Sequence, residues 1–380
     1  MTVTTPAYCS REEAMGSVDF QDGITTAIQG KVDRAVQSTA RDIEAHLHRL
    51  FYPWDGTKFF DWPNYQSASP WELFLDRNDI LCLTQFSSGG VNIPLDACFL
   101  RPANKRPGFP WTKIELDRSS GSTFGGNSAT PQNAIKPAGT WGFTADADPA
   151  GQLAAAVTSA GQAVITVSDA SRMGIGDLLI LGYGRGDAPF PDDQLGHAGT
   201  IAPYLGERVL VSDRSAADTG LAQAGPGCQT GSSGDTVLTW SGEGAVHQGE
   251  ILLLDQEQML VQGVAGSVAT VQRAFNGTQL QPHTSSEIWA YRSLDLIRGF
   301  LGTTATTWAN GTEFSKHRVP ALVRDLAIAE SSNRILQETS GYARTVGAAD
   351  AAVPAPGVAL ADLWDEVTTA YGRKVRSRVI

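Results

Sequence analysis

The longest periodic stretch of the chain lies between residues 22 and 52 and constrains the fold more than any other segment. Its apolar residues recur every three or four positions, which places them on one stripe of an α-helix while charged residues occupy the rest of the surface. Asp22 is placed to cap the start, and Pro53 ends the helix. We expect a core helix with one apolar stripe and one polar face. Its candidate core residues are Ile28, Val32, Ile43, Leu47 and Leu50.

Helical periodicity returns near the end of the chain. A second helix is predicted from Pro320 to Gly341, and an Ala/Pro linker at 348–357 leads to a third candidate at 360–380. A short helix capped by Ser10 is predicted at the start of the chain, with Glu12 and Glu13 in its first turn. The simplest arrangement packs the stripe of 22–52 against the stripe of 320–341.

Between the helical ends the pattern is β. Short alternating runs fill residues 58–145, and a module of turns and strands at 160–292 contains a sharp Asn276-Gly277 turn. The predicted fold class is therefore α+β, with a small helical-bundle core made by the N- and C-terminal helices, a β-hairpin segment and a large inserted β-rich domain. The predicted divisions are 1–57 (helical core), 58–145 (β segment with a loop arm), 150–295 (inserted β domain), 315–345 (return helix) and 346–380 (linker and C-terminal arm).

Charge and cysteine content limit the classes of function. A net charge of −11 over 380 residues is unsuited to gripping nucleic-acid phosphates, although DNA could pass nearby. The four cysteines have no metal-binding spacing, so we expect reduced, structural thiols. The first residues lack a signal-peptide pattern, and no run approaches the roughly 18 apolar residues of a membrane span. A soluble protein made in the cytoplasm, with no membrane partner, is expected.

Motifs for nucleotides and metals are weak. The glycines of Gly182-Tyr-Gly184-Arg-Gly186 follow a strand, but no helix follows them, so a turn is expected. His46 and His48 point in different directions on a helix, and the remaining histidines have no metal-binding context. Asp187, Asp192 and Asp193 lack the glycine and terminal glutamate of a calcium loop. No cofactor and no metal are expected.

Enzyme motifs are equally sparse. Asp255 and Glu257 occupy alternate positions of a strand and could share one face, as glycosidase carboxylates do, but most such pairs are surface charge. The sequence has no Gly-x-Ser-x-Gly elbow and no reactive Cys/His setting. We expect no catalytic residues and no enzymatic activity. A hydrolase using Asp255 and Glu257 is kept only as a hypothesis that an activity screen can dismiss.

The C-terminal end is basic, and two interpretations stay open. Its cations can compensate the dipole of the last helix. They can also form a docking arm for an acidic partner or DNA, because four cations in six residues exceed what one helix end needs. The candidate docking residues are Trp364, Arg373, Lys374, Arg376 and Arg378.

Several segments together resemble a known family. They are VDRAVQSTARDIEAHLHRLFYPWDGTKFFDWP (32–63), WELFLDRNDILCLTQFSSGG (71–90), Gly-Thr-Trp-Gly-Phe (139–143) and VPALVRDLAIAESSNRILQETSG (319–341). In this order the chain resembles the head–tail connector (adaptor) proteins of long-tailed bacteriophages, over roughly half its length. The 160–292 stretch, with GEILLLDQEQMLV, VQRAFNGT and IWAYR, looks like a β insertion carried by some phage neck proteins.

The resemblance implies a structural role in the neck of the virion. Adaptors form rings, commonly of twelve subunits, that dock on the portal protein and hold stopper or tail-terminator proteins below. The genome passes through the lumen without sequence-specific binding. The alternative is a carbohydrate-binding or baseplate-type tail protein, suggested by Trp240, Trp289 and Tyr291 in the β module.

Overall fold

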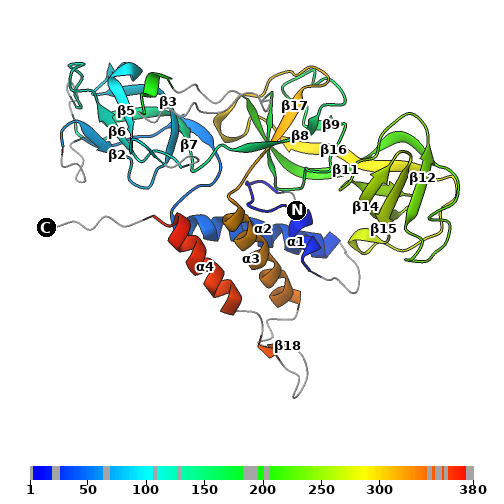
Figure 1. Ribbon diagram of the computed structural model, residues 1–380. Coiled ribbons are helices and arrows are strands. Elements are labelled where there is room, and N and C mark those ends of the chain that lie inside the picture. Colours follow the sequence, from blue (N-terminus) through cyan, green and yellow to red (C-terminus); the bar gives the residue numbers. More distant parts are fainter. Residues whose placement is uncertain are drawn as a thin grey trace.

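The computed structural model describes residues 3–18, 26–62, 69–105, 109–125, 130–182, 196–200, 206–339, 345–346, 353–354 and 358–373. Figure 1 shows three β units arranged in a row, with a layer of helices beneath them. The first β lobe stands at one end, a body sheet lies in the middle, and a barrel stands at the other end.

Four α-helices are found in the described part of the chain. α2 packs against α3, as predicted, and α4 packs against α3 in turn. Ser10 caps α1 through a capping box with Glu13, which confirms the predicted cap. The helices are α1 (Arg11–Gly16), α2 (Thr26–Leu47), α3 (Ala321–Thr339) and α4 (Val358–Tyr371).

The stripe predicted on α2 lies in the core. Val32, Ile43 and Leu47 are buried, and Ile28 and Leu50 pack against the same cluster. The helix ends at Leu47, five residues before the predicted end, because His48 adopts a left-handed backbone with φ 53°. The predicted cap, Asp22, lies outside the described residues.

The first β lobe consists of two antiparallel sheets around one core. The buried Trp141 and Leu83 belong to one sheet, and Ile114 and Leu100 belong to the other. The first sheet has the order β1 (Trp54–Thr57), β7 (Ile135–Trp141), β3 (Ile80–Ser88) and β4 (Val91–Asn92). The second has the order β2 (Glu72–Phe74), β6 (Lys113–Leu116) and β5 (Cys98–Arg101).

The body and the barrel share one ten-stranded antiparallel sheet. Its strands β11 and β16 run from the body into the barrel and also pair with each other, which closes six strands (β11, β12, β15, β14, β13, β16) into the barrel. The sheet order is β8 (Ala147–Gln152), β17 (Glu313–His317), β10 (Leu178–Leu181), β11 (Glu207–Gln223), β12 (Val237–Ser241), β15 (Val268–Gln272), β14 (Glu257–Ala265), β13 (Ile251–Leu254), β16 (Glu287–Ile297) and β9 (Val164–Thr166).

One turn of the barrel has the conformation that its sequence predicts. Asn276 and Gly277 have φ angles of 55° and 68°, as the predicted Asn-Gly turn requires. Outside these sheets, β18 (Thr345–Val346) and β19 (Val353–Pro354) form a small hairpin.

The predicted fold class is wrong. The chain is mostly β, and three of its four largest buried clusters lie within β structure. The β-rich module is not an insertion hung from a helical bundle, because β11 and β16 continue through the barrel into the body sheet. The helices instead form a single layer beside the β units (Figure 1). Among the described residues, no helix combines the length and apolarity needed to cross a membrane.

The four cysteines are buried and free, as predicted. Burial raises the pKa of the Cys9, Cys82 and Cys98 thiols to about 12 and that of Cys228 to about 11. These side chains therefore stay protonated and unreactive at neutral pH.

Candidate functional site

One group of buried and half-buried polar side chains lies where the barrel joins the body. β11 and β16 pass through this junction, and their pairing shifts register between Ser215 and Ala217 and between Asp218 and Leu221. Such bulges bend and twist a pair of strands. The turn before β13 and the loop after β9 meet beside this bend.

Glu250 is the centre of the junction. Its carboxylate is almost fully buried and forms a two-point ion pair with Arg292 of β16, with Nε–Oε1 and Nη2–Oε2 distances of 2.7 Å. The backbone N–H of Ala170, in the body loop, donates to Oε1 at 3.3 Å. The carboxylate therefore ties the barrel turn to the body, and burial makes such a pair costly to break.

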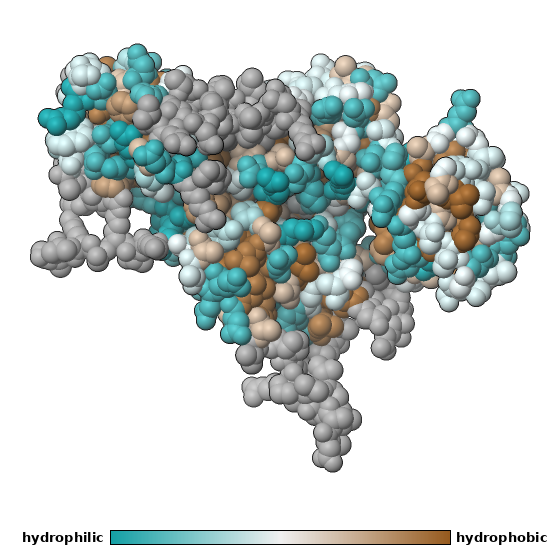
Figure 2. All heavy atoms as spheres, in the orientation of Figure 1, coloured by the Kyte–Doolittle hydropathy of each residue, from teal (hydrophilic) through white to brown (hydrophobic). Residues whose placement is uncertain are grey.

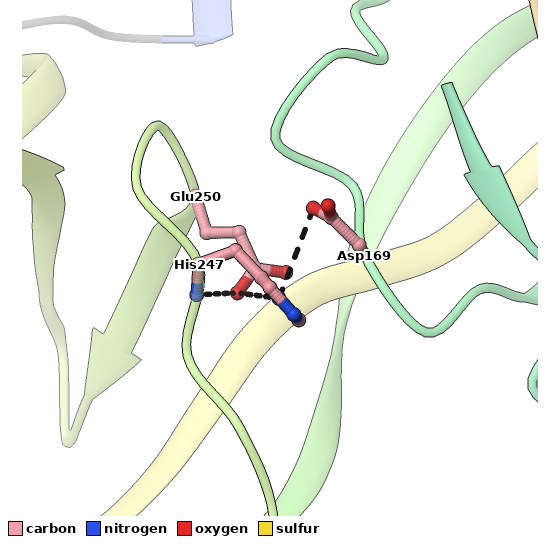
Figure 3. A group of neighbouring side chains, drawn as sticks. All are labelled: Asp169, His247 and Glu250. Carbon is pink, nitrogen blue, oxygen red and sulfur yellow. Dashed lines mark hydrogen bonds and ion pairs between the residues drawn. The ribbon is translucent and has the colours of Figure 1, made fainter. Parts of the chain in front are cut away.

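His247 and Asp169 extend the junction toward solvent (Figure 3). The Nδ1 atom of His247 lies 3.2 Å from Oε2 of Glu250 and 3.8 Å from Oδ1 of Asp169. Figure 3 shows Asp169 reaching toward the other two side chains from the opposite loop. One imidazole and two carboxylates at these distances form a potential ligand set for a divalent metal.

The donor set does not suit a metal ion. Both oxygens of Glu250 already accept hydrogen bonds from Arg292, and Nη2 of Arg292 also lies 3.3 Å from Nδ1 of His247. A divalent ion bound to His247 and Glu250 would sit beside this guanidinium and would have to displace its hydrogen bonds. Arg292 acts as the resident cation, so the cluster is best described as an ionic junction.

A large cleft adjoins the barrel, with a volume of about 1630 Å³. Its walls come from α1, the start of α3, the 171–174 loop of the body and the outer side of the barrel around Phe275. Ion pairs line two of these walls: on the body, Nζ of Lys316 lies 2.7 Å from Asp177, and between α3 and α1, Nη2 of Arg324 lies 2.6 Å from Glu13. Opposite charges are therefore paired along these walls, which gives the cleft no marked preference for a charged ligand.

A second ionic group lies inside the barrel and involves the acid pair considered from the sequence. Glu257 is fully buried and forms a two-point pair with Arg273 at 2.8 Å, while His283 contacts Glu257 through Nε2 and Asp255 through Nδ1. Burial raises the pKa of Glu257, but the hydrogen bonds from Arg273 and neighbouring groups outweigh it and bring the pKa down to about 2. Glu257 is closed off from solvent, so the pair does not form an open carboxylate cleft.

The candidate docking residues occupy different settings. Trp364 packs edge-on against His46 with ring centres 5.1 Å apart, and it belongs to the helical core. Arg373 contacts Asp79 of the first lobe at 2.7 Å, so it is not a free end of an arm. Lys374, Arg376 and Arg378 lie outside the described residues, and their docking role stays a prediction.

The aromatic residues behind the carbohydrate hypothesis do not form a common surface. Trp240 is buried inside the barrel, whereas Trp289 is 37% exposed on its outside. The hydroxyl of Tyr291 accepts a hydrogen bond from Gln258 at 2.7 Å. The loop carrying Asp187, Asp192 and Asp193 lies outside the described residues, as do the glycines after Gly182.

Sequence reasoning missed the arginines that hold both ionic groups. Arg273 and Arg292 each lie in or next to a strand of mostly apolar residues. A guanidinium buried in such a strand is costly unless it is paired with a carboxylate. That pattern is the signal that could have pointed to Glu257 and Glu250. Sequence reasoning also gave His247 no metal-binding context, whereas the structure places it beside Asp169 and Glu250. Of the other histidines, His46 lies 3.1 Å from the hydroxyl of Thr368, and His317 donates to the carbonyl of Phe51 at 2.6 Å.

Comparisons with other proteins identify no relative. The chain matches no protein-family model, no curated protein and no solved structure. Its function is therefore argued from its own residues and geometry.

Proposed function

We propose that the chain is a structural adaptor of a tailed-phage neck, a subunit of a ring that docks on the portal and holds stopper or tail-terminator proteins below. The order of its sequence segments supports this role, as does a subunit built from several units with separate faces. A ring of about twelve subunits through which DNA passes is part of the proposal, as is its place in the virion.

The observation that carries the proposal is the exposed apolar side of the helical layer. Figure 2 shows hydrophobic residues gathered on α3 and α4. Leu336 is 45% exposed, and Leu322, Leu360 and Leu363 are only partly buried. Apolar side chains gathered on one exposed face are typical of a contact with another protein.

The fixed barrel adds a second reason. β11 and β16 cross the junction between barrel and body. The ion pair between Glu250 and Arg292 also links the turn before β13 to β16. A barrel held in this way projects from the body at a fixed angle, which a subunit of a repeating assembly needs if every copy is to present the same surface.

Binding to purified portal tests the proposal. The full chain is mixed with portal rings, and the complex is isolated by size and imaged by negative stain. An added ring of density on the portal is expected. Portal rings that stay bare in the presence of excess folded chain would contradict the proposal.

The docking arm needs a narrower test than removal of residues 348–380, because that deletion would also remove α4 from the helical core. Replacing Lys374, Arg376 and Arg378 with serine leaves α4 and Arg373 in place. We expect weaker portal binding with unchanged thermal stability. Unchanged binding would assign docking to the helical layer alone.

A further inference from the structure

The outer face of the barrel carries an exposed tryptophan with acids close to it. Trp289 of β16 is 37% exposed, and its neighbours Ile288 and Ala290 are fully buried. Because side chains alternate along a strand, Glu287 points to the same outer face as Trp289. On the neighbouring strand β11, Asp218 is the residue directly opposite Trp289, and it is also exposed. Directly opposite residues have Cβ atoms about 5 Å apart, so the Asp218 carboxylate lies within reach of the indole.

A third acid, Asp255, lies at the same end of this face as Glu287. The residue before it, Leu254, pairs with Ile288, the residue after Glu287. The Asp255 side chain is 52% exposed, and its hydrogen bonds, first of all with His283, lower its pKa. It is therefore negatively charged at neutral pH. Three carboxylates thus lie near the exposed indole.

The barrel has no unpaired cation to balance these acids. Residues 206–299, all of which the structure describes, contain no lysine. Their arginines all form ion pairs with carboxylates, at distances of 2.6 to 3.4 Å. These arginines are Arg208, Arg214, Arg273, Arg292 and Arg298. A cation that balances the acids around Trp289 has to come from outside the barrel.

The indole itself lacks the partner that other tryptophans of this chain have. Trp54 lies under the ammonium of Lys58 at 4.5 Å, and Trp71 lies under the guanidinium of Arg118 at 4.6 Å. Among the described residues, no cation stacks on the ring of Trp289. A lysine or arginine over an indole is attracted by the ring quadrupole, and carboxylates beside it pair with the same charge. The face therefore suits a basic side chain.

The chain itself contains a segment with this chemistry. Residues 373–378 carry four cations and no acid. Three of the cations occupy alternate positions, namely Lys374, Arg376 and Arg378. In an extended segment such side chains share one face and repeat about every 7 Å, which is also the spacing of Glu287 and Trp289 along β16. The segment and the barrel face are therefore complementary in charge and in spacing.

The segment and the barrel face belong to opposite ends of the molecule. Arg373 contacts Asp79 of the first β lobe at 2.7 Å. Figure 1 shows that lobe and the barrel at the two ends of the row, with the body between them. Arg378, five residues later, stays within about 18 Å of Arg373 even in a fully extended chain. Complementary surfaces at opposite ends of one chain favour a head-to-tail contact between copies.

We propose that Trp289, Asp218, Glu287 and Asp255 bind residues 374–378 of a second copy of the chain. A lysine or arginine of that segment lies over the indole, and the neighbouring cations pair with the carboxylates. Repeated head to tail, this contact builds a ring or a filament. The inference rests on the proposed adaptor role for its ring, and it names the next subunit as the partner of the basic segment.

Calorimetric titration with a synthetic peptide of residues 372–380 tests the site. The receptor is the full chain with three cations replaced by serine, so that no second copy occupies the face. The replaced residues are Lys374, Arg376 and Arg378. Saturable binding that weakens with added salt is expected. No saturable binding at about 1 mM peptide would overturn the proposal.

Paired substitutions of acids show whether the peptide binds at Trp289. Adding Asp218→Asn and Glu287→Gln to the receptor should weaken binding about tenfold or more, because both charges beside the indole are lost. The matched control, Asp295→Asn with Glu313→Gln, removes two exposed acids of the body sheet and should leave the affinity unchanged. Equal losses in the two double variants would show general attraction to an acidic protein and would overturn the site.

Disulfide trapping tests whether the partner is a second copy. The four natural cysteines are buried, so Gln256→Cys beside Asp255 and Ser377→Cys in the basic segment provide the exposed thiols. Mild oxidation of this full chain should give a ladder of covalent dimers and longer oligomers. Val164→Cys on the exposed strand β9, combined with Ser377→Cys, is the control and should stay monomeric. A disulfide closed within one chain, an absence of oligomers, or an equal ladder in the control would overturn the assignment to a second copy.

Neither test contains the portal, so the two proposals fail separately. Loss of the peptide and disulfide results removes the contact between copies and leaves the result of the portal experiment standing. Bare portal rings contradict the adaptor role and leave the contact between copies standing.

Discussion

Arg208 of β11 holds Asp55 of β1 through a two-point ion pair, with Nη1–Oδ2 and Nη2–Oδ1 distances of 3.0 and 3.1 Å. The side chain of Arg208 is fully buried, and its Nη1 also donates to the carbonyl of Leu301. Asp55 in turn accepts a hydrogen bond from Thr140 of β7. This pair joins the body sheet to the first β lobe across their boundary.

Removing the carboxylate of this pair should destabilise the protein markedly. Asp55→Asn leaves the Arg208 guanidinium buried without its counter-charge, and we expect a loss of about 3 kcal/mol in the free energy of unfolding. Urea titration measures this loss. The control is Asp148→Asn, whose partner Arg318 is 57% exposed, and it should cost less than about 1 kcal/mol. Equal effects of the two substitutions would show that the buried pair does not join the lobes.

The buried Glu257 should make the barrel sensitive to acid. Its pKa in the folded protein is about 2, below the ordinary value of 4.5, so its contribution is complete above pH 4.5 and is lost as pH falls toward 2. The difference corresponds to about 3 kcal/mol. Unfolding measured between pH 5 and 2 should show this loss.

Glu257→Gln is the variant that tests the acid effect. It should be less stable near neutral pH, because Arg273 loses its partner, and its stability should depend less on pH below 4.5. Glu243→Gln, on the exposed surface of the barrel, should keep the pH dependence of the natural chain. A steep acid transition that survives in Glu257→Gln would assign it to other carboxylates.

The helices were easier to predict than the architecture. The stripe of Val32, Ile43 and Leu47 repeats over six turns, which makes α2 visible in the sequence, and its packing on α3 follows from their matching stripes. Strands such as β9 and β10 span three or four residues and carry little periodic signal. The continuity of β11 across the barrel junction depends on pairings between residues about 80 positions apart, and local patterns do not encode such pairings.

The two ionic groups of the barrel could not be predicted from the sequence either, because their partners are also far apart in the chain. Asp255 and Glu257 could be recognised as a pair, but their partner His283 lies more than twenty residues away, and Arg273 reaches Glu257 only because the barrel closes. Arg373 was a candidate docking residue because four cations and no acid lie between residues 373 and 378. Asp79, which holds it, lies almost 300 residues earlier.

His317 should give a second, separate pH dependence. Burial lowers its pKa to about 4, against an ordinary value of 6.5, so folding favours the neutral ring. Its contribution is complete above pH 6.5 and is lost as pH falls from 6.5 to 4, by about 3 kcal/mol. His317→Gln retains an N–H donor for the carbonyl of Phe51 and should flatten the stability profile in that window, measured by urea titration. An unchanged profile would contradict the prediction.

The ionic junction should not recruit a metal. Because Arg292 occupies both oxygens of Glu250, zinc or manganese should leave the melting temperature of the natural chain unchanged. Arg292→Ala frees the carboxylate beside His247 and Asp169, and in that variant zinc should raise the melting temperature measured by calorimetry. His247→Ala added to Arg292→Ala should abolish this response. Zinc stabilisation of the natural chain would show that Arg292 yields to the ion.

The contact between Arg373 and Asp79 should anchor the end of α4. Tyr371, two residues earlier, packs edge-on against Phe51 and Phe143, so the last turn of the helix is held by rings and by this ion pair together. Arg373→Ala leaves the buried Asp79 with Arg49 alone and should speed amide hydrogen exchange in α4 by about tenfold or more, while exchange in α2 stays unchanged. Asp365→Asn, on the exposed side of the same helix, is the control and should have no effect. If Arg373→Ala exchanges as slowly as the control, the rings alone hold α4, and Arg373 is available to a partner.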